Sequence, residues 1–174
     1  MTPSTPNDLQ PQQAFALLLE TACSEFETLQ ALVSGQISLV GPEALSVPVR
    51  AKATIQMALA KSFLFNANRA NRVCFKNKPR LSLDRQERED FLRATKSLGD
   101  VRDVNEHGYD GDPRSEKNRP SMHEQDGGFL DETSLVVLGP DKIFMGPLNL
   151  RDIFAAVARM RSVAGFSALA GTQP

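Results

Sequence analysis

The chain has 174 residues, of which 41% are hydrophobic and 24% charged, and its formal net charge is −1. This composition is typical of a globular protein and excludes a largely disordered chain. The length suits one domain. With no run of 18 apolar residues and no basic and apolar leader at its start, the sequence predicts neither a membrane span nor a secretory signal. We therefore expect a single cytoplasmic domain.

The cysteines and histidines are too few and too scattered to predict a metal site. Cys23 and Cys74 fall in helix-like segments, without a CxxC spacing or a nearby histidine cluster. We expect both thiols to be small buried groups in a reducing compartment. His123 falls in an expected loop and is interpreted as a solvated side chain. The sequence predicts no metal and no cofactor.

Charges are distributed unevenly along the chain. Residues 1–43 carry five acidic residues and no basic one, whereas residues 44–83 carry eight basic residues and no acidic one. Such a basic block either follows the phosphates of a nucleic acid or packs between acidic helices and pairs with them at the surface. Charge alone leaves both interpretations open.

The first half of the chain predicts two long helices. After a disordered tail at 1–10, apolar residues recur at helical spacing over 11–35. An extended connection is expected over 35–48, because its prolines break a helix. The second helix, over about 48–75, is apolar around much of its circumference, which is typical of a central helix. The expected buried stripe of the first helix consists of Phe15, Leu18, Leu19, Ala22, Phe26, Leu29 and Val33.

A third helix is predicted to follow. Asp84 and Glu87 have the spacing of a capping box at its start. Its apolar stripe continues past Leu98 to Val101, and the helix is expected to end at His107, with glycine following as a natural stop.

The remaining residues predict a loop, a hairpin and a last helix. Residues 108–130 are rich in glycine, proline and charge, and predict a long mobile loop. Residues 133–148 predict a β-hairpin. Asn149 is expected to cap a helix that continues to about Val163, before a C-terminal tail at 167–174.

These elements predict a mostly α fold. We expect an antiparallel helical bundle of four main helices with one accessory β-hairpin, in a single domain over residues 11–166. A lone hairpin is marginally stable. It is therefore expected to dock on the bundle or to pair across a dimer.

Arg102 and His107 are the candidate catalytic residues. They lie five positions apart in RDVNEH, at the end of the third predicted helix. Arg102 falls close to the apolar stripe of that helix, and a buried guanidinium needs a partner. A structural partner, such as Asp103, Glu106 or an acid of the first helix, and a bound phosphate both satisfy that requirement.

This pattern resembles the Arg-polar-x3-His motif of the HEPN (higher eukaryotes and prokaryotes nucleotide-binding) domain family, with Asp103 as the polar residue. The preceding long basic helix and the following EHGYDG segment are also similar to bacterial members. The resemblance covers about residues 11–112. It implies a HEPN-like helical domain.

The resemblance also implies a metal-independent endoribonuclease. Members with the intact motif commonly dimerise, so that two Arg/His pairs face one RNA-binding cleft. His107 would act as general base or acid, because its pKa lies near neutrality. Arg102 would stabilise the charge of the phosphorane, and Asp103 or Asn105 would orient the pair.

Asn66, Arg69 and Arg72 on the basic helix are the candidate RNA-contacting residues. Hydrogen bonding between helices is the alternative role of Asn66. The expected partners are a second copy of the chain in a homodimer, RNA, and a protein such as an antitoxin.

Two alternatives of other classes stay open. The first is a non-catalytic binding or dimerisation module, in which Arg102 and His107 form an ion-pair and cap arrangement at a helix C-terminus. The second is an accessory subunit that docks a partner through the hairpin edge and the 108–130 loop. A catalytic pair should open into a cleft, whereas a structural pair should be packed against Asp103, Glu106 or a backbone carbonyl.

Overall fold

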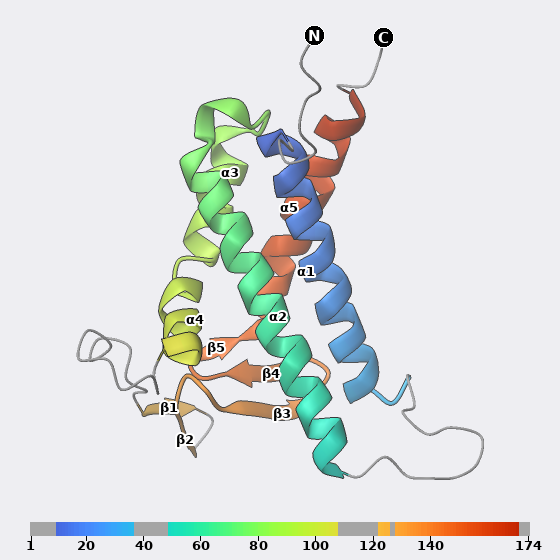
Figure 1. Cartoon of the computed structure of the whole chain (residues 1–174), viewed down its shortest axis with the longest axis vertical. Helices are drawn as coiled ribbons and strands as arrows, with labels where there is room; N and C mark the ends of the chain where they lie inside the picture. Colours follow the sequence, from blue (N-terminus) through green and yellow to red (C-terminus); the bar gives the residue numbers. More distant parts are fainter. Residues whose placement is uncertain (1–9, 37–48, 108–121, 126–127, 171–174) are drawn as a thin grey trace, which may run out of the picture.

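The computed structural model describes residues 10–36, 49–107, 122–125 and 128–170, and it is mostly helical with a small antiparallel sheet of three strands (Figure 1). Its elements are α1 (Pro11–Val33), α2 (Val49–Lys76), a 3-10 turn (Lys78–Arg80), α3 (Arg85–Ala94), α4 (Leu98–His107), β1 (His123–Gln125), β2 (Gly128–Leu130), β3 (Leu135–Gly139), β4 (Lys142–Met145), β5 (Leu148–Asn149) and α5 (Leu150–Ala170).

The helices α1 and α2 run side by side in opposite directions and organise the molecule (Figure 1). α5 packs against α1, α4 packs against α2, and α3 contacts both α2 and α5. The sheet of β3, β4 and β5 lies across one end of these helices, where β4 and β5 contact α5. α2 therefore has neighbours on two sides and keeps a further side exposed.

The core forms along the stripe that the sequence predicts for the first helix. Phe15, Leu19, Ala22, Phe26 and Leu29 are fully buried, whereas Leu18 and Val33 are only partly buried against the core. The Phe26 ring stacks on Phe154 of α5, with centroids 4.5 Å apart, and tilts against Phe63 of α2 at 5.2 Å. Burial of these apolar surfaces ties three helices together.

The predicted start of the third helix is confirmed, but only half of its capping box forms. Asp84 is the N-cap, and its carboxylate accepts hydrogen bonds from the backbone N–H groups of Gln86 and Glu87. The Glu87 carboxylate instead accepts two hydrogen bonds, of 2.9 and 2.7 Å, from the Arg159 guanidinium on α5. Glu87 thus connects two helices.

The prediction of one continuous helix from Asp84 to His107 is wrong, because α3 ends at Ala94 and α4 begins at Leu98. The hydroxyl of the buried Thr95 donates to the Phe91 carbonyl at 2.6 Å. It also accepts a hydrogen bond of 2.7 Å from Asn71 on α2. Such bonding of a threonine to the preceding turn bends a helix, and the bond from α2 fixes the bend in place.

The predicted hairpin is also corrected. β3 and β4 pair antiparallel and turn at Pro140 and Asp141, but β5 pairs with the other edge of β4, so the sheet has three strands. The second turn requires Gly146, which has a φ of +54° and lies so close to Glu132 that an added Cβ would be 2.6 Å from the Glu132 Cα atom. Only glycine combines that φ with that approach.

The structure also differs from the sequence-based prediction in the last third of the chain. β1 and β2 pair antiparallel inside the segment that the sequence predicts as a loop. Asn149 caps α5 as predicted, since its Oδ1 accepts a hydrogen bond from the Arg151 N–H, but α5 continues to Ala170 rather than ending near Val163.

The expectations for residues 1–9, 37–48, 108–121, 126–127 and 171–174 lie outside the described residues. Across the described ranges, every helix is too short or too polar to cross a bilayer.

Candidate nucleic-acid interface

Five residues of α2 form one line along its exposed side. Lys61, Phe65, Arg69, Arg72 and Lys76 follow at spacings of four, four, three and four residues, which places them within an arc of about 80° and over about 22 Å of helix. The four cationic side chains are exposed and Phe65 is half-buried. We call these five residues the basic stripe. α2 contains no aspartate and no glutamate, so no acid of its own helix neutralises the stripe.

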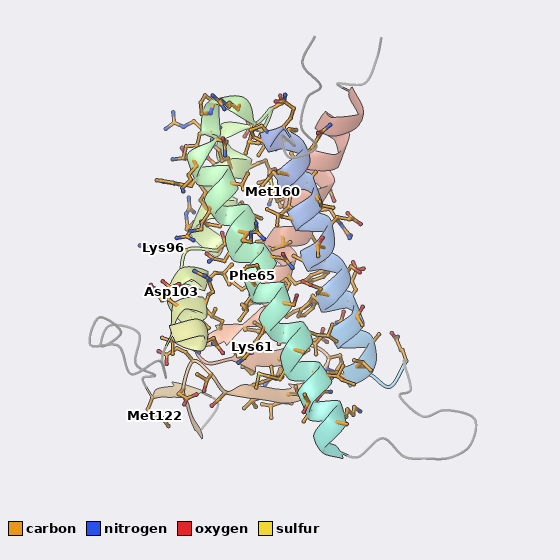
Figure 2. The ribbon with its side chains drawn as sticks, viewed as in Figure 1. Lys61, Phe65, Lys96, Asp103, Met122 and Met160 are labelled. Carbon is orange, nitrogen blue, oxygen red and sulfur yellow. The ribbon has the colours of Figure 1, made fainter. Side chains whose placement is uncertain are left out.

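Phe65 brings two arginines of different helices together. The guanidinium carbon of Arg69 lies 5.4 Å from the centre of the Phe65 ring, and that of Arg102 on α4 lies 5.8 Å from it. Both distances are in the range of cation–π attraction. Figure 2 shows Lys61 and Phe65 on α2, with Asp103 on the neighbouring α4. A predicted catalytic residue and a predicted RNA-contacting residue therefore lie against the same ring.

The Arg102 guanidinium is held by its neighbour in the sequence. Its Nη1 donates to the Asp103 carboxylate at 2.9 Å, and the Arg102 side chain is 21% exposed. Asp103 is one of the structural partners that the sequence allows. Beside this pair is a small cavity of about 70 Å³, lined by Lys61, Leu64, Phe65, Arg102 and Asn105.

Asn105 anchors α4. Its Nδ2 donates to the carbonyls of Val101 and Glu132, at 2.9 and 2.6 Å, and so ties the helix to the segment that precedes β3. Its Oδ1 is buried without a hydrogen-bond partner among the described residues. The contacts of Asn105 fix the position of the helix that carries Arg102.

His107 is the last residue of α4, and its side chain lies outside the described part of the structure. Since α4 is helical from Arg102 to His107, the two positions are about 140° apart around the axis and about 7.5 Å apart along it. They therefore lie on different faces of α4 within one chain.

Asn66 lies away from the basic stripe. Its Nδ2 donates to both oxygens of the Glu25 carboxylate on α1, at 2.9 and 3.1 Å. The Ser62 hydroxyl donates to the same carboxylate. The alternative role of Asn66, a hydrogen bond between helices, is the one that the structure shows, whereas Arg69 and Arg72 both lie on the stripe.

A groove accompanies the C-terminal half of the stripe, between the start of α1 and the end of α2. It has a volume of about 440 Å³ and is lined by Ala14, Leu17, Leu18, Arg69, Arg72, Val73, Lys76 and Asn77. Its α1 wall is apolar and its α2 wall is mostly cationic, and no acidic residue of the described chain lines it.

Sequence reasoning did not single out Lys61, Phe65 or Leu17 as site residues. For Lys61 and Phe65 the signal was available, because their spacing from Arg69 places all three on one helix face. For Leu17 it was not, since its position beside Arg72 depends on how α1 is aligned with α2.

Comparison of the chain with models of protein families, with curated proteins and with solved structures gives no match. Among the described residues, no group of three or more histidine, cysteine, aspartate and glutamate side chains is placed to hold a metal ion.

Proposed function

We propose that this protein is a HEPN-like RNA-binding protein and that the basic stripe of α2 is its RNA-binding surface. The observation that carries the proposal is the alignment of Lys61, Arg69, Arg72 and Lys76, all exposed, on a helix without a single acidic residue.

The chemistry of the stripe fits a nucleic-acid backbone. Cations at intervals of three to eight residues follow a line of about 22 Å, and each releases counterions when it neutralises a phosphate. Phe65 supports this arrangement, because its ring holds Arg69 beside Arg102. The net charge of −1 argues against non-specific binding of RNA by the whole protein surface, so RNA binding should depend on the basic stripe.

The proposal includes a homodimer. The HEPN resemblance implies that two copies of the chain form one RNA-binding cleft, and the protein should therefore have twice the mass of the 19.1 kDa chain. Multi-angle light scattering at tens of micromolar tests this. A monomer at that concentration would contradict the two-chain cleft without affecting RNA binding by a single stripe.

Fluorescence anisotropy with a labelled RNA tests binding. The Arg69→Gln, Arg72→Gln and Lys76→Gln triple variant should lose at least about tenfold in affinity, because three phosphate contacts are removed. The matched control is the triple variant Arg85→Gln, Arg93→Gln and Lys96→Gln, which removes the same charge from exposed positions of α3 and the segment after it. Equal losses in both variants would refute a specific role of the stripe.

RNA cleavage is a second candidate function. The contact of Arg102 with the Phe65 ring beside Arg69 supports it, whereas the ion pair of Arg102 with Asp103 counts against it. His107 would accept the proton of a ribose 2′-OH, whose oxygen attacks the adjacent phosphorus and expels the 5′-oxygen of the next nucleotide, which takes a proton from water. Arg102 would stabilise the negative charge that collects on the phosphorane. The product would end in a 2′,3′-cyclic phosphate.

Cleavage and binding without cleavage are distinguished by two variants. His107→Ala and Arg102→Ala should each lower cleavage about a hundredfold or more, with circular dichroism unchanged. EDTA should have no effect, and RNA with a 2′-deoxy nucleotide at the cut site should stay intact. RNA that is bound but never cut would instead support the non-catalytic module, for which the ion pair between Arg102 and Asp103 is the supporting contact.

A further inference from the structure

We infer that the groove between α1 and α2 is a subsite for an unpaired RNA base, next to the phosphate-binding part of the basic stripe. This inference rests on the proposed function and assigns a further role within it. The groove has one apolar wall, from α1, and one wall of cations, from α2, with a volume of about 440 Å³. A nucleotide has the same two-sided chemistry, with an apolar base face and an anionic phosphate.

The apolar side of the groove is exposed. Leu17 on α1 keeps 57% of its surface accessible although the neighbouring Leu18 packs partly into the core. Leu17 lines the groove together with Arg69, Arg72 and Lys76. A surface that bound only phosphates would gain nothing from an exposed leucine, whereas a base laid against Leu17 would remove apolar area from water.

A second exposed apolar side chain lies outside the groove, on the other edge of the basic stripe. Phe75 is 61% exposed, and it lies about 60° around the helix from Arg72, on the edge of the stripe opposite Val73. The Lys78 ammonium lies 4.5 Å from the centre of its ring. Exposed aromatic rings beside cations are the usual platform on which proteins stack the bases of single strands.

Charge selects the occupant. All three charged residues that line the groove are cationic, and the described residues contribute no acid to its walls. A ligand that matches these walls carries negative charge next to an apolar group. A single-stranded RNA segment satisfies both requirements, because its bases are free to leave the stack and contact protein side chains.

The test compares two labelled strands of equal length, about 12 nucleotides, which spans the binding site of a typical single-strand domain. One strand carries bases and the other is abasic throughout, so that they share phosphates and differ only in bases. Wild-type protein should bind the base-carrying strand about tenfold more tightly than the abasic strand. Leu17→Ala should remove most of this difference and leave the affinity for the abasic strand unchanged, because Leu17 lines the groove.

Leu138→Ala is the matched control, because Leu138 is 59% exposed and β3 lies at the end of the helices away from the groove (Figure 1). It should bind both strands like the wild type. Equal wild-type affinity for the two strands, or equal losses on both strands in Leu17→Ala, would overturn the base subsite while leaving the phosphate-binding stripe intact. Failure to bind either strand would instead overturn the proposed function itself.

Discussion

Asn66 and Arg72 are both candidate RNA-contacting residues in the sequence, but they have different surroundings on α2. Asn66 donates to both carboxylate oxygens of Glu25 between α1 and α2, whereas Arg72 is exposed on the basic stripe. Hydrogen bonds to a charged group stabilise a protein by more than those between neutral groups. The first residue should therefore act on stability and the second on binding.

Asn66→Ala should lower the free energy of unfolding by about 1–3 kcal/mol, because it removes the amide group that donates to both oxygens of a half-buried carboxylate, and should leave RNA affinity close to that of the wild type. Arg72→Gln should weaken RNA binding about threefold or more with little change in stability. Urea unfolding and fluorescence anisotropy measure the two effects. The opposite pattern, with Asn66→Ala stable and deficient in binding, would place Asn66 in the interface.

The two cysteines give a prediction on pH. Burial raises the pKa of the Cys23 and Cys74 thiols from 9.0 to about 11, although Arg161 near Cys23 and Arg88 near Cys74 act in the opposite direction. Because the folded thiols keep their protons to higher pH than the unfolded ones, their contribution to the free energy of unfolding is intact below pH 9 and is lost as the pH rises towards 11.

At pH 8 the native protein should therefore react with a thiol-specific reagent at least tenfold more slowly than the urea-unfolded chain, since only the thiolate is reactive and both side chains are inaccessible. The absorbance of the released reagent measures the rate. Rapid labelling of either thiol in the folded protein would show that its helix opens locally or that the thiol is not buried.

At the scale of elements, periodicity and caps predicted the long helices well. The apolar repeat placed the ends of α1 within about two residues of those observed, because this helix buries one face over many turns. The prolines of the preceding connection placed the start of α2 equally well. The break at Thr95 was not predictable in the same way. It depends on a hydrogen bond from Asn71, a residue of another helix. The sequence did not predict β5, because a strand of two residues is too short to show an alternation of apolar and polar side chains.

A substitution at Gly146 tests whether the turn between β4 and β5 requires glycine. Gly146→Ala should lower the free energy of unfolding by more than the roughly 1–2 kcal/mol of an alanine in the left-handed region, because its Cβ would also meet the backbone of Glu132. Gly35→Ala is the matched control, with a φ of +74° and no atom within 4 Å of the added Cβ. Equal losses in thermal unfolding of the two variants would show that the approach to Glu132 is unimportant.

At the scale of the molecule, the candidate site combines what sequence could predict with what only packing determines. The acid-free character of α2 is visible in the sequence, and so is the alignment of Arg69 and Arg72. The convergence of Arg69 and Arg102 on Phe65 requires α4 to lie against α2. The groove beside Leu17 requires the alignment of α1 with α2. Neither the convergence on Phe65 nor the groove can be predicted from the sequence of one helix alone.

The dependence of RNA affinity on salt concentration tests the central claim most directly. For a single strand, the slope of log affinity against log salt changes by about 0.7 for each phosphate contact. The Arg69→Gln, Arg72→Gln and Lys76→Gln variant should therefore have a slope shallower than that of the wild type by about 2, whereas the Arg85→Gln, Arg93→Gln and Lys96→Gln variant should keep the wild-type slope. An unchanged slope in the first variant, or an equal change in both, would show that the basic stripe of α2 does not hold the RNA backbone.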